Sequence, residues 1–112
     1  MNVLVEGNLT ESQEEWWSEQ YIGSIINLIN PLELEAEKFE DNNIYEIIVM
    51  LSDKVSKFYD MSSHKRKLRD NLSKSYYFRA ISFSKLKKYT EADIYFKRDY
   101  EYCKKYDKRE DL

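Results

Sequence analysis

The chain has 112 residues, of which 42% are hydrophobic and 15% aromatic, and a formal net charge of −3. This composition supports a single domain with its own core, and the presence of only 2 glycines and 1 proline argues against a turn-rich β-sandwich. A single cysteine excludes an internal disulfide framework and leaves too few thiols for a zinc cluster. The composition therefore predicts an all-α fold, a bundle of four or five helices.

The net charge hides a division along the chain. Residues 1–63 contain 13 acidic and 3 basic residues, a net charge of −10, whereas residues 64–112 contain 8 acidic and 15 basic residues, a net charge of +7. Oppositely charged halves can attract each other within one molecule, between two copies, or toward separate partners. The simplest expectation is attraction within the fold, while a homodimer and an external partner both stay open.

The first segment, residues 1–9, is predicted to be an N-terminal arm with a short apolar patch at Val3–Val5. It lacks basic residues and a long apolar run, so it does not resemble a signal peptide. The longest aliphatic run, from Ile47 to Leu51, is too short to span a bilayer. We therefore expect no membrane association and a cytoplasmic location.

Residues 10–60 make up the acidic helical half. A first helix is predicted to begin with a capping box, formed by Thr10 with Gln13 or by Ser12 with Glu15, and to stop before Pro31 because proline disfavours the α conformation in the residue that precedes it. A short second helical segment follows. The predicted buried stripe of the first helix is Trp17, Tyr21, Ile25 and Leu28, widened by Ile22, Ile26 and Ile29.

A turn at 41–43 leads to a further helix from Ile44 to about Tyr59, the clearest helical pattern in the chain. Its predicted buried face is Ile44, Ile47, Ile48, Leu51, Val55 and Phe58.

Residues 64–107 make up the basic half. A helix is predicted from Lys65 to Lys88, and Thr90 is expected to cap the last helix. The tail, residues 108–112, is polar and expected to fray. The predicted inner residues are Leu68, Leu72, Tyr76, Ala80, Phe83 and Leu86 on the first of these helices, and Ala92, Phe96, Tyr100, Cys103 and Tyr106 on the second.

The two basic helices are joined by so few residues that they must be antiparallel neighbours. Their spacing of aromatic and small residues resembles one tetratricopeptide repeat, a helix–turn–helix unit of about 34 residues, here at about 73–106. The stretch departs from the pattern at Arg79, where leucine is usual, at Asp99, where alanine is usual, and at Lys104, where no proline follows. The matching residues are Tyr76, Ala80, Phe83, Tyr89, Ala92 and Phe96.

The resemblance implies a stack of hairpins that binds a protein or peptide, because the first helix of each tetratricopeptide unit lines a concave groove. The residues it places in that groove alternate lysines with aromatic and aliphatic side chains, and helical spacing extends the stripe to Lys88. Such a surface suits an acidic, partly apolar peptide, although its aromatic and aliphatic members can equally pack under another helix. The candidate residues are Lys74, Tyr77, Ile81, Ser84, Lys85 and Lys88.

Two other functions are weighed against this one. The acidic half could cover a basic toxin, as an immunity or antitoxin protein does through charge complementarity. Alternatively, the helix from Lys65 to Lys88, with nine basic residues and one acidic residue, could bind nucleic acid, although the −10 half opposes this. The candidate acidic residues are Glu14, Glu15, Glu19, Glu33, Glu37 and Glu40.

The sequence does not predict an enzyme. His64 is the sole histidine, so a metal site with two imidazoles is excluded. Ser82 and Lys85 match a Ser-x-x-Lys pattern, but the companion motifs of that chemistry are missing. Two glycines cannot build a phosphate-binding loop. We therefore predict no cofactor and no metal.

Overall fold

The computed structural model describes residues 10–106, so the predicted arm at 1–9 and the predicted tail at 108–112 lie outside the described residues. Within the described range the chain forms four α-helices and one short 3-10 helix, and it contains no strand. The all-α prediction is therefore confirmed for this part of the chain. The elements are α2 (Glu11–Phe39), α3 (Asn42–Met61), η1 (Lys65–Leu68), α4 (Arg69–Lys85) and α5 (Tyr89–Tyr106).

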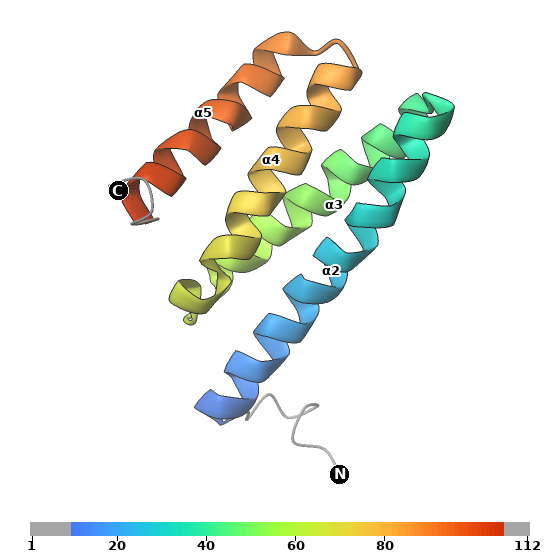
Figure 1. Cartoon of the computed structure of the whole chain (residues 1–112). Helices are drawn as coiled ribbons and strands as arrows, with labels where there is room; N and C mark the ends of the chain where they lie inside the picture. Colours follow the sequence, from blue (N-terminus) through green and yellow to red (C-terminus); the bar gives the residue numbers. More distant parts are fainter. Residues whose placement is uncertain (1–9, 107–112) are drawn as a thin grey trace.

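Helices consecutive in the chain lie side by side (Figure 1). The α2–α3 pair and the α4–α5 pair are two antiparallel hairpins, which meet where α3 packs against α4. α4 also contacts α2, so it is the helix with the most neighbours, whereas the backbone of α5 approaches α4 alone among the described helices. None of the helices between residues 10 and 106 has the length and apolar character needed to cross a bilayer.

The prediction that α2 stops before Pro31 is wrong. α2 continues through Pro31 as one helix of 29 residues, and the predicted separate second segment is its C-terminal part. A proline in this position removes one backbone donor, the one that would bond the carbonyl of Asn27. Ile29 before it and Ala36 after it are both fully buried, so packing of one continuous face on both sides of Pro31 outweighs the local penalty.

The N-terminal cap of α2 follows the first of the two predicted capping boxes. The Gln13 N–H donates to Thr10 Oγ1 over 3.2 Å, and the Thr10 N–H donates to Gln13 Oε1 over 3.0 Å. The buried stripe of α2 is rotated from the predicted one, since Trp17 is 45% exposed and Leu28 is 50% exposed. The covered face is centred on three isoleucines that were predicted to lie at the edge of the stripe. The buried residues of that face are Ser18, Ile22, Ile26, Ile29 and Ala36.

α3 shows a smaller rotation of the same kind. Ile48 and Val55 are fully buried as predicted, but Ile47 is 41% exposed. The turn predicted at 41–43 is displaced, because Asp41 Oδ1 accepts from the Asn43 N–H over 2.9 Å and caps α3. α3 contacts α2 on one side and α4 on the other, so its covered face is centred between them. The buried residues of α3 are Tyr45, Ile48, Ser52, Val55 and Tyr59.

The predicted helix over 65–88 is divided into η1 and α4, which ends at Lys85. Thr90 lies inside the first turn of α5 and does not cap it, so that prediction is wrong. The turn is closed by N–H groups of Lys87 and Lys88, which donate to the carbonyls of Ser84 and Phe83 over 3.0 and 2.8 Å. Lys87 adopts a positive φ of 63° in this arrangement, which is a Schellman motif.

The inner face of α5 also differs from the prediction. Ala92 is buried as expected, but Phe96 is 38% exposed and Tyr100 is 63% exposed. Tyr95 and Tyr102 face α4 in their place, since both rings lie about 6.2 Å from the ring of Tyr76. Aromatic ring contacts therefore set the rotation of α5.

Candidate functional site

The residues implied by the tetratricopeptide resemblance share one side of α4, while Lys88, which was predicted to continue their helical stripe, lies in the turn after α4 ends at Lys85. We call this set of residues the α4 outer face. Its lysines are exposed, Tyr77 is 47% exposed, and Ile81 and Ser84 are half-buried. Tyr77 contacts Phe96 of α5 edge-on, with the ring centroids 6.4 Å apart. The face therefore combines accessible aromatic surface with positive charge. Its residues are Lys74, Tyr77, Ile81, Ser84, Lys85 and Lys88.

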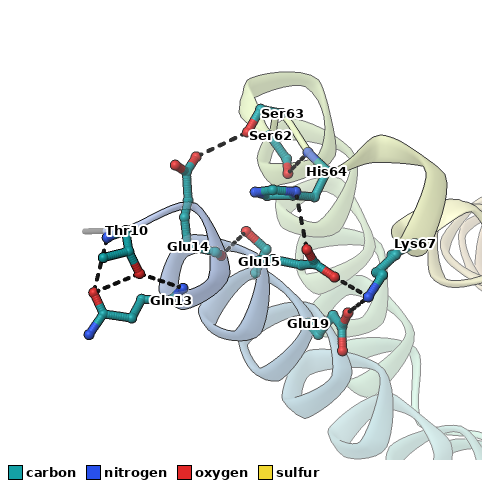
Figure 2. A network of polar contacts seen from close by, with 10 residues as sticks. Thr10, Gln13, Glu14, Glu15, Glu19, Ser62, Ser63, His64 and Lys67 are labelled. Atoms are coloured by element: carbon teal, nitrogen blue, oxygen red, sulfur yellow. Dashed lines mark hydrogen bonds and ion pairs between the residues drawn. The ribbon is translucent and has the colours of Figure 1, made fainter. Parts of the chain in front are cut away.

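The acidic candidates do not form one patch. Glu14, Glu15 and Glu19 lie in the first turns of α2, where they meet the segment between α3 and α4 (Figure 2). Glu33, Glu37 and Glu40 lie at the other end of the same helix. Glu15 and Glu33 are about 27 Å apart along the axis, at ~1.5 Å of rise per residue.

The first acidic group contacts the linker after α3 and the start of the basic half of the chain. The Ser63 hydroxyl donates to Glu14 Oε1 over 3.3 Å. Lys67 Nζ forms an ion pair with Glu15 and lies 3.7 Å from Glu19 Oε1 (Figure 2). We call these contacts, with the His64 contact described next, the α2–linker network. It shows two oppositely charged segments meeting within one molecule.

His64 completes this network. The Nδ1 atom of its ring lies 3.8 Å from Glu15 Oε2, and its backbone N–H donates to Ser62 Oγ over 3.0 Å. The Nε2 atom of the ring is buried without a hydrogen-bond partner in the described part of the chain. The hydrogen bond from Lys67 lowers the pKa of Glu15, and the same bond raises the pKa of Lys67. The network therefore holds the charged forms of both partners at neutral pH.

The second acidic group is less well compensated. Glu33 is half-buried, and its Oε2 atom is covered without a hydrogen-bond partner among residues 10–106. Burial and the nearby Glu37 raise the pKa of Glu33, and Lys85 of the α4 outer face opposes them. The acidic and basic candidates thus approach each other at the α2–α4 contact.

A basic cleft lies between the start of α4 and the end of α5. It has a volume of about 670 Å³. The sequence analysis named Lys74 as a site residue but missed Arg66 and Arg69; the run KRKLR at 65–69 was the available signal. The cleft is lined by Arg66, Lys67, Arg69, Asp70, Ser73, Lys74, Tyr102, Cys103 and Tyr106.

Arg69 is the cation of this cleft that stacks on an aromatic ring. Its guanidinium lies 4.0 Å from the centroid of the Tyr106 ring, and no ion pair or hydrogen bond holds it within the described range. From the same α4 wall the Ser73 hydroxyl donates to Asp99 Oδ1 of α5 over 2.5 Å, and the Cys103 thiol of α5 lies 3.2 Å from that hydroxyl. The cleft therefore has its cations on the η1–α4 wall, and this polar cluster joins that wall to α5.

Arg79, which departs from the tetratricopeptide pattern, is buried at 3% exposure. Its Nη2 donates to Ser56 Oγ over 3.0 Å and lies 3.5 Å from Asp53 Oδ1 on α3. Its guanidinium also lies 4.5 Å from the centroid of Tyr95 on α5. Arg79 thus joins three helices and is removed from any nucleic-acid surface.

Exposed tryptophans mark another surface, on the outside of α2. Trp16 and Trp17 are 54% and 45% exposed, and their rings meet edge-on with centroids 5.0 Å apart.

Among residues 10–106, no three His, Cys, Asp or Glu side chains are placed to hold a metal ion. Comparison with protein-family models, curated proteins and solved structures finds no match to the chain.

Proposed function

We propose that the protein is a non-enzymatic interaction module that binds an acidic, partly apolar segment of a protein or peptide on the α4 outer face. The observation that carries the proposal is Tyr77, which is 47% exposed between α4 lysines. Aromatic residues with cations around them are enriched where proteins bind one another. The groove implied by the tetratricopeptide resemblance consists of these same residues.

The charges of this face are available to a partner. Lys74, Lys85 and Lys88 form no ion pair with other described residues, and Lys85 lies near enough to Glu33 of α2 to oppose the rise in its pKa. A partner carboxylate near Lys88 would not have to displace an internal ion pair. Complementary charge of this kind chiefly accelerates association and selects the partner, while the Tyr77 and Ile81 side chains supply apolar contact.

The test is capture of the partner from cells of the source organism by the tagged protein, followed by affinity measurement with the purified pair. A double variant, Lys85→Gln and Lys88→Glu, should weaken binding at least about tenfold, and Tyr77→Ala should do the same. The Gln at 85 avoids placing a third carboxylate beside Glu33. The matched control is Lys97→Gln with Lys54→Glu, which makes the same charge change at exposed lysines on α5 and α3.

Binding that survives all of these variants would exclude the α4 outer face. Nucleic acid captured in place of a protein, and released as salt rises, would favour the nucleic-acid alternative. That alternative is weakened because Arg79 is buried and Lys67 is paired with Glu15.

An immunity or antitoxin function is a second candidate, because Glu37 and Glu40 are exposed and unpaired among the described residues. The other end of the acidic face is occupied by the α2–linker network, so a basic toxin would have to use the C-terminal end of α2. Reversal of Glu37 and Glu40 to lysine should then abolish binding, whereas the Lys85/Lys88 variant should leave it unchanged.

A further inference from the structure

We propose that the basic cleft between α4 and α5 binds the phosphate groups of a small phosphorylated molecule. This is a second site, beside the α4 outer face and independent of it, although Lys74 borders both. The proposal starts from the number and state of the cations that line the cleft. Four cationic side chains and one carboxylate face it, and Lys67 is engaged by Glu15.

Three cations therefore remain for a ligand: Arg66, Arg69 and Lys74. None of them forms an ion pair with another described residue, although Asp70 is on the same wall. With Asp70 subtracted, the lining keeps about two uncompensated positive charges, which suits a multiply charged phosphate group better than a single carboxylate. Asp99 is not part of the lining, and its Oδ1 accepts from the Ser73 hydroxyl.

The Arg69 side chain is already held in position before a ligand binds. Stacking on Tyr106 fixes the Arg69 guanidinium without using its terminal N–H groups, and its Nε is covered with no partner in the described part. A planar guanidinium can offer two parallel N–H groups to two phosphate oxygens. Because the side chain is already oriented, less conformational entropy is lost when an anion binds.

The cleft is also large enough for more than an isolated ion. Its volume of about 670 Å³ lies within the usual range of small-molecule sites, which is roughly 300–1,000 Å³. Tyr102 and Tyr106 on the α5 wall supply aromatic surface for the organic part of a ligand. Inorganic diphosphate and a nucleoside diphosphate share the phosphate chemistry and differ in whether they use this surface.

The test is titration of the full chain with pyrophosphate and, separately, with ADP, at constant ionic strength without added metal, with amide NMR shifts and calorimetry as readouts. We expect saturable shifts at Arg66, Arg69, Ser73 and Cys103. Arg66→Gln should weaken pyrophosphate binding about tenfold, the loss typical of one charge-assisted contact. Arg66 is exposed and its side chain forms no hydrogen bond or ion pair with another described residue, so this variant should fold normally. Tighter binding of ADP than of pyrophosphate identifies a nucleotide-like ligand.

The control is Lys88→Gln, which removes one charge in the turn between α4 and α5, outside the lining of the cleft, and should change the affinity less than about twofold. Arg69→Lys keeps the charge and should still lose affinity, because the guanidinium geometry is lost. Absence of saturable shifts, equal effects of Arg66→Gln and Lys88→Gln, or binding to an oligonucleotide alone would each overturn the proposal. If the cleft fails these tests, the proposed function still stands when partner binding depends on Lys88 and not on Arg66. If pyrophosphate binding depends on Arg66 but partner binding does not depend on Lys88, the cleft proposal stands and the proposed function fails.

Discussion

α4 has two interfaces, which we call seams, one with α2 and α3 and the other with α5, and they are built from different side chains. Toward α2 and α3 the core is aliphatic, and Ile22, Ile29, Ile48, Val55 and Leu68 are all fully buried. Toward α5 the seam is aromatic and half-exposed, and Ala92 is the one residue of α5 that is buried among those described. A seam that removes less apolar surface from water contributes less to stability. The difference predicts that α5 opens before the remaining helices separate.

Arg79 is the residue that spans both seams. It receives support from α3 through Ser56 and from α5 through the Tyr95 ring. The proposed cleft depends on the weaker seam, because Tyr102 and Tyr106 form its α5 wall. A ligand that bridges α4 and α5 would therefore stabilise the part of the molecule that opens most readily.

The largest effect is expected in the aliphatic core. Ile48→Ala should lower the free energy of unfolding by about 3 kcal/mol, through lost burial and the cavity left behind. Urea denaturation followed by circular dichroism measures this change. Ile47→Ala is the matched control, because its side chain is 41% exposed, and it should cost less than about 1 kcal/mol. Equal losses at the two positions would show that the burial of α3 is assigned wrongly.

The second prediction concerns Arg79. Arg79→Ala should destabilise the protein by about 2 kcal/mol, because it removes a buried hydrogen bond and the packing of the long side chain. Hydrogen exchange should show lost protection in α5 as well as in α3 and α4. Asp53→Asn serves as the comparison: that carboxylate is half-exposed, and its loss should cost less than about 1 kcal/mol. If α5 keeps its protection in Arg79→Ala, the bridging role of Arg79 is excluded.

Tyr102→Phe tests the aromatic seam itself. Tyr102 and Tyr59 share a hydrogen bond of 3.0 Å between their hydroxyl groups, the polar contact that ties α5 to α3. Its removal should cost about 1 kcal/mol, and the exchange of α5 amides should rise more than that of α3 amides. Tyr100→Phe makes the same chemical change at a residue that is 63% exposed, and it should leave both helices unchanged.

Alkaline pH should weaken the same seam. Burial and the hydrogen bond with Tyr59 raise the pKa of Tyr102 above its ordinary value of 10.0. The folded state therefore holds the proton more tightly than the unfolded state, and stability that is complete below pH 10 falls as the pH rises further. The loss is at most about 1.4 kcal/mol per pH unit above 10, and solvent screening at this half-buried ring makes it smaller. The difference in melting temperature between pH 8 and pH 11 should be smaller for Tyr102→Phe than for the unaltered protein. Tyr100→Phe should leave that difference unchanged.

The contrast between the seams also explains what the sequence could predict. Helical periodicity located α3 and the α4–α5 hairpin, because apolar residues repeat along one face of each helix. It misplaced the centre of the buried stripe of α2, because the isoleucines that it treated as a flank are the covered ones: Ile22, Ile26 and Ile29. Ser18 and Ala36 continue that face at either end. The sequence analysis missed the continuation through Pro31 because a local penalty was outweighed by tertiary packing. Arg66 and Arg69 share a cleft only once α5 returns alongside α4.

The smallest predicted effect compares the turns of the two hairpins. Glu40 and Lys87 both adopt a positive φ, at 50° and 63°, in the turns that follow α2 and α4. The Asp41 N–H donates to the Ala36 carbonyl over 3.1 Å, as the Lys88 N–H does to Phe83, so the two turns use the same closing bond.

Glycine adopts this conformation without steric cost, so Glu40→Gly and Lys87→Gly should each raise the free energy of unfolding by about 0.5 kcal/mol, after the larger entropy of the unfolded glycine chain is subtracted. The two should differ in where the gain appears. If the α5 hairpin opens separately, Lys87→Gly slows amide exchange in α5 more than it raises global stability, whereas Glu40→Gly acts on the whole molecule. Identical exchange profiles for the two variants would mean that both seams open in one cooperative step.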